Sequence, residues 1–326
     1  MRSRRIRILL TSAGTSTALG VIKGLSDNDY FEICTTDVNP YEMLALGAFN
    51  IVSHHIVPYA SRGQEFVERI DNLVEELSID HIYPIHDEEI RTLHGSSLER
   101  IVERLSSLNI NSIKKCTNKL VAHQICVEYS INTPRTSEVS TFLEKPFFPV
   151  FVKPKIGVGS IGARLVKSHS DLFDSDGDLV VQDVCEGPEV TVDCLTWEGS
   201  TIAVARERIE IKSGVSTKAR IFFSNELQII AKALADRFEL VGMFCFQVMR
   251  YNNEWAVIDI NPRSGGASAM LLACGINFYQ EHFLIQAGLC DKSRFDALAV
   301  KVSQLSASNV VRYYSEHRIE LGSQND

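Results

Sequence analysis

The chain has 326 residues, of which 45% are hydrophobic and 23% charged, and its formal net charge is −8. This length allows two or three domains with a substantial core. The negative charge argues against broad nucleic-acid binding, which needs a basic surface, and no segment approaches the roughly 20 apolar residues of a membrane helix. The eight cysteines are scattered without a C-x-x-C pair, which favours reduced thiols in a cytoplasmic protein over a disulfide framework or a zinc site.

The first third of the chain alternates between strand and helix signals. Strands are predicted at 6–12, 31–37 and 81–85, and helices at 17–27, 66–79 and 97–109. This alternation predicts a parallel sheet covered by helices. Ligands of such sheets bind beyond the carboxyl ends of the strands, so the segments that follow each strand are the ones to inspect.

Two of those segments imitate a dinucleotide-binding fingerprint. Gly14 and Gly20 follow the first strand, and Asp37 ends the second. The central glycine of G-x-G-x-x-G is missing, because Thr15 and Ser16 come directly after Gly14, and that glycine lets the backbone approach the pyrophosphate. We therefore favour a tight strand-to-helix turn and predict no NAD site.

The third segment is acidic and has two interpretations. Asp87, Glu88 and Glu89 follow the third strand and could face a ligand cleft at its end. They could equally form the acidic first turn of a helix, which the helix dipole favours.

A glycine-punctuated hairpin is predicted in the middle of the chain. After a helix at 118–130 and a proline-containing extended segment, an apolar strand ends at Lys153 and leads into a loop before another strand. The small residues of the loop are Gly157, Gly159, Ser160 and Gly162. They can present backbone N–H groups to phosphate, although such hairpins are also simple flexible turns.

The remainder is mainly β, with helices between the strands. Several β-like runs cover 179–211 with turns at 186–188 and 198–199, and a hairpin over 242–262 turns at 252–253. Amphipathic spacing predicts a helix at 226–238. A further helix is predicted at 267–275 and a last strand at 309–321.

The second strand of the 242–262 hairpin ends in the sequence WAVIDINPRSGG. Asp259, Asn261 and Arg263 occupy alternate positions, and alternate side chains of a strand point the same way. A carboxylate, an amide and a guanidinium on one face, followed by Gly265 and Gly266, make a poor core. The pattern favours a polyanion-binding site.

Five segments in this order resemble the motifs of the ATP-grasp superfamily, especially of members related to the synthetase subunit that makes carbamoyl phosphate. They are NK at 118–119, VKPKIGVGSIG at 152–162, VQDVCEGPEVTVD at 181–193, FQVMR at 246–250 and IDINPRSGG at 258–266. The resemblance spans nearly the whole chain. It implies an α/β protein with a Rossmann-like domain at 1–110, followed by an α+β ATP-grasp part with a small lobe at 111–181 and a C-terminal lobe at 182–322.

The resemblance also implies an ATP site, position by position. Lys119 and Lys153 match the two lysines that grip the nucleotide phosphates, a role that suits a compact, flexible cation. The loop at 157–162 matches the segment that closes over the phosphates. The hinge that meets adenine is matched by Gln182, Asp183, Val184 and Cys185. Glu189 matches the ribose-binding carboxylate, with an ordinary strand glutamate as the alternative.

The resemblance also implies which residues bind the metal ion and the transferred phosphate. Gln247, Asp259 and Asn261 match Mg²⁺ ligands, with Mn²⁺ as an alternative ion, since hard oxygen donors suit Mg²⁺ at about 2.0–2.1 Å. Arg263 matches the catalytic guanidinium that holds the phosphate in transfer and the acyl phosphate formed from it. Many relatives carry an acid in place of Gln247 and glutamate in place of Asp259, so a second Mg²⁺ is expected to bind weakly.

Basic residues at 205–221 are candidates for binding an acidic acceptor. Arg206 follows an apolar run and is the stronger candidate for a catalytic role, beside Lys153 and Arg263. Lys218 would add positive charge to the same segment. Arg208 and Lys212 fit a solvated hairpin of mixed charge equally well.

The resemblance implies a ligase that phosphorylates a carboxylate with ATP and couples the acyl phosphate to an amine. Its partners would be small-molecule carboxylates and amines, and a homodimer is left open. The length argues against a complete carbamoyl phosphate synthetase, which needs two such units and a source of ammonia. The alternatives are an ATP-grasp enzyme with a thiol acceptor or an acyl-phosphate product, and a nucleotide-binding regulatory subunit without catalysis.

Overall fold

The computed structural model describes residues 4–26, 28–106, 110–157, 162–172, 178–212, 214–313 and 315–319. It has the mixed α/β fold that the sequence predicts, with one parallel and two antiparallel sheets. The chain divides into two compact units. Unit 1 is Met1–Ser107, Gly266–Asp291 and Arg312–Asp326, and unit 2 is Leu108–Gly265 and Lys292–Val311. The finer division at 110 and 181 remains a proposal.

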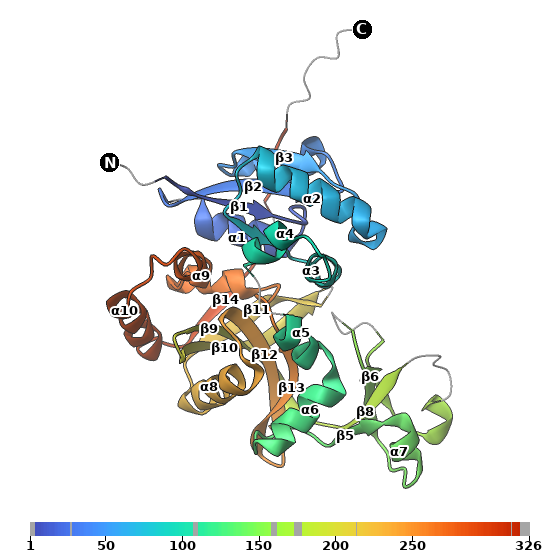
Figure 1. The fold of residues 1–326 in the computed structure, drawn as a ribbon. Coiled ribbons are helices and arrows are strands. Elements are labelled where there is room, and N and C mark those ends of the chain that lie inside the picture. The colour runs from blue at the N-terminus through green and yellow to red at the C-terminus, as the bar shows by residue number, and fades with distance from the viewer. Residues whose placement is uncertain are drawn as a thin grey trace. The chain divides into compact units, whose positions relative to one another are not determined.

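Unit 1 contains a four-stranded parallel sheet in the order β3-β2-β1-β4 (Figure 1). Its strands are β1 (Ile6–Leu10), β2 (Phe31–Asp37), β3 (Ser53–Ile56) and β4 (His81–Tyr83). Its α-helices are α1 (Ser16–Leu25), α2 (Gln64–Glu76), α3 (Asp87–His94), α4 (Glu99–Arg104) and α9 (Phe278–Gln286). Short 3₁₀ helices are η1 (Tyr41–Met43), η2 (Ala45–Ala48), η3 (Ala60–Arg62) and η5 (Ser268–Cys274).

Helix α2 shows how the sequence pattern attaches a helix to this sheet. Its buried side chains recur every three or four residues, as one face of a helix requires. They are Phe66, Val67, Ile70, Leu73 and Val74. These side chains share a core with Leu9 of β1 and Ile82 of β4. Burying one such side chain contributes about 1.5–3 kcal/mol, so this apolar face is what holds α2 on the sheet.

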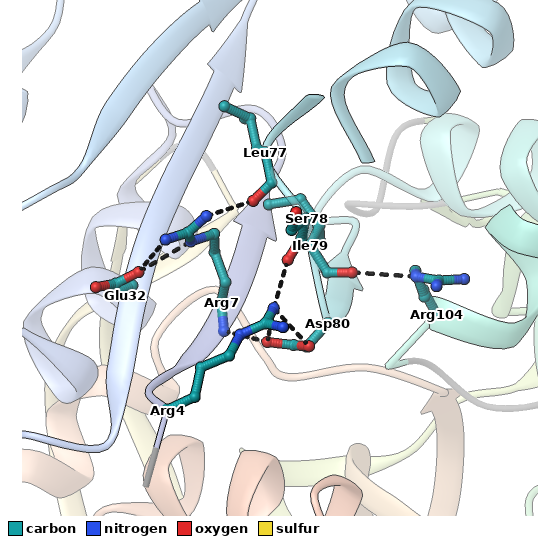
Figure 2. A network of polar contacts seen from close by, with 8 residues as sticks. All are labelled: Arg4, Arg7, Glu32, Leu77, Ser78, Ile79, Asp80 and Arg104. Carbon is teal, nitrogen blue, oxygen red and sulfur yellow. Dashed lines mark hydrogen bonds and ion pairs between the residues drawn. The ribbon is translucent and has the colours of Figure 1, made fainter. Parts of the chain in front are cut away.

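Figure 2 shows a polar network at the amino ends of the strands of unit 1. The backbone N–H of Arg7 donates to Asp80 Oδ2 at 2.8 Å, and the Arg7 guanidinium contacts Glu32 at 2.6 Å. Arginine side chains also donate to three successive carbonyl oxygens of the α2–β4 connection, those of Leu77, Ser78 and Ile79. Carbonyl oxygens at a helix C-terminus lack partners within the helix, so these bonds supply the missing partners and have a structural role.

Unit 2 contains a small antiparallel sheet in the order β5-β8-β6-β7. Its strands are β5 (Thr136–Glu138), β6 (Val150–Pro154), β7 (Arg164–Val166) and β8 (Leu179–Asp183). On β6, Val150 and Val152 are buried in a core with Phe142 of α7 (Val139–Leu143), so the alternate residues Phe151 and Lys153 face the other way. The predicted hairpin around the glycine-rich loop is confirmed by the β6–β7 pairing.

Unit 2 also contains a six-stranded sheet in the order β13-β12-β9-β10-β11-β14 (Figure 1). Its strands are β9 (Glu186–Trp197), β10 (Ser200–Lys212), β11 (Val215–Phe222), β12 (Gly242–Tyr251), β13 (Glu254–Asn261) and β14 (Ser308–Val311). Its helices are α5 (Ile110–Thr117), α6 (Lys119–Glu128), α8 (Asn225–Phe238) and α10 (Lys292–Ser303), and η4 is His169–Leu172. The turn at 252–253 is confirmed, with both asparagines at positive φ.

The structure differs from the sequence predictions in several places. The helix predicted at 97–109 stops at Arg104, because Leu105 is buried and forms a bridge with Ile82. Helix α5 was not predicted, since its polar residues were interpreted as a boundary. The segment at 267–275 forms η5 rather than an α-helix, and the last strand ends at Val311 instead of 321. Among the described helices, none is both long and apolar enough to span a membrane.

Candidate active site

A cavity of about 370 Å³ lies within unit 2. It is lined by residues from the start of α6, from the small sheet and from one face of the six-stranded sheet. Those that the sequence predicted as site residues are Lys119, Lys153, Gly157, Gln182, Asp183, Val184, Cys185, Glu189, Gln247 and Asp259. The fold therefore gathers residues from a sequence span of 140 positions into one cavity, although their individual roles stay predictions.

Part of the cavity wall is apolar and was not predicted. Phe151, Ala163, Leu165, Met249 and Ile258 line it beside the predicted residues. Phe151 could have been found from the sequence, because it lies two positions before Lys153 in the same strand and so shares its face. An apolar wall with convergent polar groups is typical of a small-molecule site, and its flat aromatic and aliphatic surface suits a heterocycle.

Lys153 is the most buried cation of this wall, at 6% exposure. Its Nζ donates to Gln182 Oε1 at 3.0 Å and to the Ile258 carbonyl at 2.7 Å. Burial lowers the pKa of Lys153 to about 8, while Asp259 opposes that change. An ammonium has three N–H donors and these bonds use two. Lys153 is thus held rigidly and can direct its remaining donor into the cavity.

Lys119 lies at the first position of α6, directly after the helix cap. The cap is Asn118, whose side chain accepts from the backbone N–H groups of Leu120 and Val121 at 3.2 Å. Lys119 Nζ donates to the Gly157 carbonyl at 3.0 Å and lies 3.5 Å from Asp259 Oδ1. This lysine therefore connects the glycine-rich loop to the acidic residue of β13.

The glycine-rich loop is described only at its ends. A Cβ on Gly157 would lie 3.1 Å from Pro154, and Gly162 has a φ of +75°. Both positions therefore have a steric reason to be glycine. Gly159 and Ser160, which were predicted to contact phosphate, lie outside the described residues.

Strand register assembles a polar row across the six-stranded sheet. Gln247 of β12 pairs with Asp259 of β13 on one side and with Thr191 of β9 on the other. Gln247 Nε2 donates to Glu189 Oε1 at 2.6 Å, and Asn261 Nδ2 donates to Asp259 Oδ2 at 3.2 Å. Each carboxylate thus binds the amino end of an amide. The carbonyl ends of both amides consequently point away from these carboxylates.

This donor set fits Mg²⁺. One carboxylate, from Asp259, and two amide oxygens, from Gln247 and Asn261, are hard ligands of the kind that Mg²⁺ prefers. Among the described residues, no group of three or more His, Cys, Asp and Glu side chains is arranged to hold a metal. With one formal charge, the set suits an ion that is held partly by phosphate oxygens.

The predicted hinge is braced by a second polar group. Asp183 Oδ2 accepts from the Tyr251 hydroxyl at 2.6 Å, and Asp183 Oδ1 accepts from Arg135 at 3.3 Å. The hydrogen bond to Asp183 raises the pKa of Tyr251. Since Asp183 ends β8 and Tyr251 ends β12, the bond ties the small sheet to the six-stranded sheet beside the cavity.

Sequence and fold comparisons identify the family of this site. Residues 175–306 match a family model described as ATP-grasp in the biosynthetic pathway with Ter operon. D-alanine--D-alanine ligase A of Bacillus cereus is 22% identical over 215 residues, which cover 61% of this chain and 71% of that protein. The L-amino acid ligase of Bacillus licheniformis has a TM-score of 0.71 at 14% identity, covering 94% of this chain and 79% of that one.

Two carboxylases share the fold as well. The biotin carboxylase domain dimer of the Hydrogenobacter thermophilus 2-oxoglutarate carboxylase, crystallised with MgADP and bicarbonate, has a TM-score of 0.72 at 14% identity, covering 89% of this chain and 71% of that one. A Rhizobium etli pyruvate carboxylase has a TM-score of 0.71 at 14% identity over 89% of this chain, which spans only 30% of that longer protein.

Residues 175–306 of the chain thus match the ATP-grasp family, as the sequence motifs indicated. The chain is similar in sequence to a ligase, and it shares its fold with a solved ligase and with carboxylases over most of its length.

Two predicted catalytic residues are not among the described residues that line the cavity. Arg206 is 2% exposed, and its Nε donates to Asp193 Oδ2 at 3.0 Å. Arg263 follows β13, and its Nη1 donates to the Ser264 carbonyl at 3.1 Å. The bond to Asp193, which the sequence analysis missed, makes Arg206 part of the sheet interior, and the catalytic roles of both arginines remain predictions.

In unit 1, the side chain of Glu89 and the backbone N–H of Gly14 form hydrogen bonds to neighbouring residues of the unit. Asp87, Glu88 and Glu89 form the acidic first turn of α3, which is the helix-turn interpretation. Glu89 is 7% exposed and accepts from Thr11 Oγ1, after β1, at 2.6 Å. Gly14 N–H donates to Asp37 Oδ2 at 2.8 Å, and a Cβ on Gly14 would lie 2.8 Å from Leu44 Cδ2. This tight packing gives Gly14 a steric reason to be glycine, and the absence of an NAD site stays a prediction.

Proposed function

We propose that the protein is an Mg²⁺-dependent ligase that activates a carboxylate with ATP and joins it to an amine. The observation that carries the proposal is the cavity, where Lys119 and Lys153 face the polar row containing Gln247 and Asp259. Two cations and a hard-oxygen metal site around an apolar wall suit the triphosphate and base of a nucleotide. Two proteins that the chain resembles, a D-alanine--D-alanine ligase and an L-amino acid ligase, are by name ligases of amino acids.

In the proposed first step, a substrate carboxylate oxygen attacks the γ-phosphorus of ATP. The bond from that phosphorus to the β,γ-bridging oxygen breaks, and ADP leaves with the electron pair. In the second step the amine nitrogen attacks the acyl carbon, the bond to the phosphate oxygen breaks, and inorganic phosphate leaves. The amine loses one proton overall. Little covalent chemistry falls to the protein, so positioning and charge neutralisation would supply the catalysis.

The proposed roles follow from the positions of the side chains. Lys153, held by Gln182 and the Ile258 carbonyl, would orient the phosphates with its third N–H donor. Lys119 would join the glycine-rich loop to the phosphates. Gln247, Asp259 and Asn261 would hold Mg²⁺, which when bound neutralises phosphate charge. Arg263 would bind the phosphate in transfer, since it follows the same strand two positions after Asn261.

The reaction can be tested without knowing the amine. The protein is incubated with Mg²⁺-ATP, pooled amino acids and dipeptides as carboxylates, and hydroxylamine as a universal nucleophile. We expect ADP release together with hydroxamate, which forms when hydroxylamine traps an acyl phosphate. ADP release without hydroxamate from any carboxylate pool would contradict the proposal, and thioester formation with coenzyme A would favour a thiol acceptor.

A matched pair of variants checks that the cavity is responsible. Lys153→Met should abolish hydroxamate formation. Lys155→Met is the control, because Lys155 lies two positions further along and binds the exposed Glu138 at 2.8 Å rather than lining the cavity. Equal losses in both variants would separate the activity from this cavity.

A cytoplasmic location and a homodimer remain proposals. All eight cysteines are free in the structure, which is compatible with a reducing compartment. One of the fold neighbours is described as a domain dimer. Light scattering of the purified protein would test the oligomeric state directly.

A further inference from the structure

Arg208 contacts Glu189, which lines the cavity, although Arg208 itself does not line it. Strands β9 and β10 pair Val190 with Glu207, so the next step of the antiparallel register places Glu189 beside Arg208. On the other side of β9, Gln247 is opposite Thr191, two positions from Glu189 on the same face. Glu189 is therefore flanked by an arginine on one neighbouring strand and an amide on the other.

The contacts follow that register. Arg208 Nη1 binds Glu189 Oε1, and the same oxygen accepts from Gln247 Nε2 at 2.6 Å. Arg208 Nη2 donates to the Gly214 carbonyl at 2.8 Å, which anchors the guanidinium to the β10–β11 turn. The Arg208 side chain is 7% exposed and that of Glu189 is 25% exposed, so the arginine lies inside and the carboxylate faces the cavity.

This arrangement determines which end of the Gln247 amide is available to a ligand. A primary amide has a donor end and an acceptor end, and a carboxylate can accept only from the donor end. With the donor end bound to Glu189, the oxygen end is the one left for a metal. Side chains that orient metal ligands in this way typically change metal affinity by about 10–100-fold when they are removed.

The positive charge of Arg208 has a second effect on the cavity. Glu189 and Asp259 are two carboxylates beside a cavity that would receive a polyphosphate. A guanidinium bound to one of them offsets its repulsion of the phosphates, and a buried guanidinium is screened little by solvent. Arg208 would thus orient the Gln247 amide and offset the negative charge of Glu189 without contacting the nucleotide.

We propose that Arg208 is a positioning residue, which acts through Glu189 to turn the Gln247 oxygen toward the bound metal ion. The inference rests on the proposed function, because it assumes that this cavity binds a metal–nucleotide complex. It assigns Arg208 to the support of the metal site rather than to the binding of an acidic acceptor.

The test compares ADP binding with and without Mn²⁺, which stands in for Mg²⁺ and can be followed by electron paramagnetic resonance as well as by calorimetry. Arg208→Gln should weaken Mn²⁺-dependent ADP binding about 10–100-fold. Metal-free ADP binding should change less than about twofold, since the base and phosphate contacts remain. Arg208→Lys keeps the charge but loses the planar fork, so it should recover part of the loss.

A double-mutant cycle separates positioning from general damage. Glu189→Gln removes the carboxylate through which Arg208 would act, and it should reproduce the loss of Mn²⁺-dependent ADP binding even if Arg208→Gln folds poorly. The double variant should bind Mn²⁺-ADP about as weakly as either single variant, because both changes break the same connection. The matched control is Arg220→Gln, which breaks an exposed ion pair with Glu207 on the same hairpin and should leave binding unchanged.

The possible failures are distinguishable. If the wild-type protein binds ADP no better with Mn²⁺ than without it, the metal–nucleotide site itself is wrong and the inference falls with it. If the wild type shows Mn²⁺-dependent binding but Arg208→Gln retains it fully, only the positioning role is wrong. Additive losses in the cycle, or equal losses with and without Mn²⁺, would also contradict that role.

Discussion

Two regions of the molecule place carboxylates at the ends of strands, yet they use them differently. In unit 1, Glu89 is buried and accepts from the backbone N–H groups of Ile85 and His86, at 3.3 and 3.0 Å, besides the Ser12 hydroxyl at 2.8 Å. In unit 2, Glu189 and Asp259 accept from the ends of long or rotatable side chains beside a cavity.

The difference concerns which partners can be exchanged. Bonds between a carboxylate and the backbone of its own turn fix that turn, and replacing them with a ligand would leave buried N–H groups unpaired. Bonds between a carboxylate and a mobile amide or lysine can be exchanged for bonds to a ligand at little cost. A row of acidic residues thus indicates a binding site when its partners are side chains facing an open cavity.

The largest expected effect concerns the buried ion pair of Arg206 and Asp193. Asp193→Asn would leave Arg206 without its buried carboxylate partner, both side chains being at most 3% exposed. Breaking one side of a buried ion pair should lower the unfolding free energy by about 3–5 kcal/mol, measured by urea denaturation. Unchanged stability, combined with lost turnover, would favour the substrate-binding role predicted from the sequence.

Arg263→Ala tests which groups act in the ground state. It should reduce turnover about a hundred- to a thousandfold, roughly 3–4 kcal/mol, while ADP affinity stays nearly intact. Asp259→Ala should weaken both metal-dependent ADP binding and turnover. Calorimetry and ADP release measure the two quantities, and an equal loss of ADP affinity in both variants would make Arg263 a ground-state ligand.

The pH dependence of ADP affinity tests Lys153. Its folded-state pKa is lowered to about 8, so the free protein loses this positive charge as the pH rises above 8. Phosphate binds the protonated form, and Mg²⁺-ADP affinity should therefore fall above pH 8, by at most about tenfold per pH unit. Lys153→Met should bind more weakly at pH 7 and lose this dependence, whereas a parallel decline in both proteins would assign the titration elsewhere.

The smallest expected effect concerns the turn of unit 1. NADH fluorescence should show no enhancement on addition of the protein, because Thr15 and Ser16 follow Gly14 and the central glycine that lets a backbone approach the pyrophosphate is missing. An enhancement that Gly14→Val removes would show that this turn binds a dinucleotide after all. In that case, a carboxylate whose hydrogen bonds are made within its own turn could still belong to a binding site.

The sequence by itself determined the local features of this protein. An apolar run predicts β6 with Lys153 at its end, and the alternate positions of Asp259, Asn261 and Arg263 predict a polar strand end. These inferences hold because side-chain direction in a strand depends only on position along the chain. The family motifs are local for the same reason, since each is a short run of residues.

Only the tertiary structure decided which of these local features meet. The register of β9, β10 and β12 brings Arg208, Glu189 and Gln247 together, and an irregularity after Gln247 adjusts its pairing with β13. Strand pairing depends on the packing of residues that are distant in sequence, because a shift of one residue would turn every side chain to the other face. For that reason the sequence indicated Arg206 as a cation for an acidic acceptor and left Arg208 between that role and a solvated hairpin, whereas the fold pairs both with carboxylates of β9.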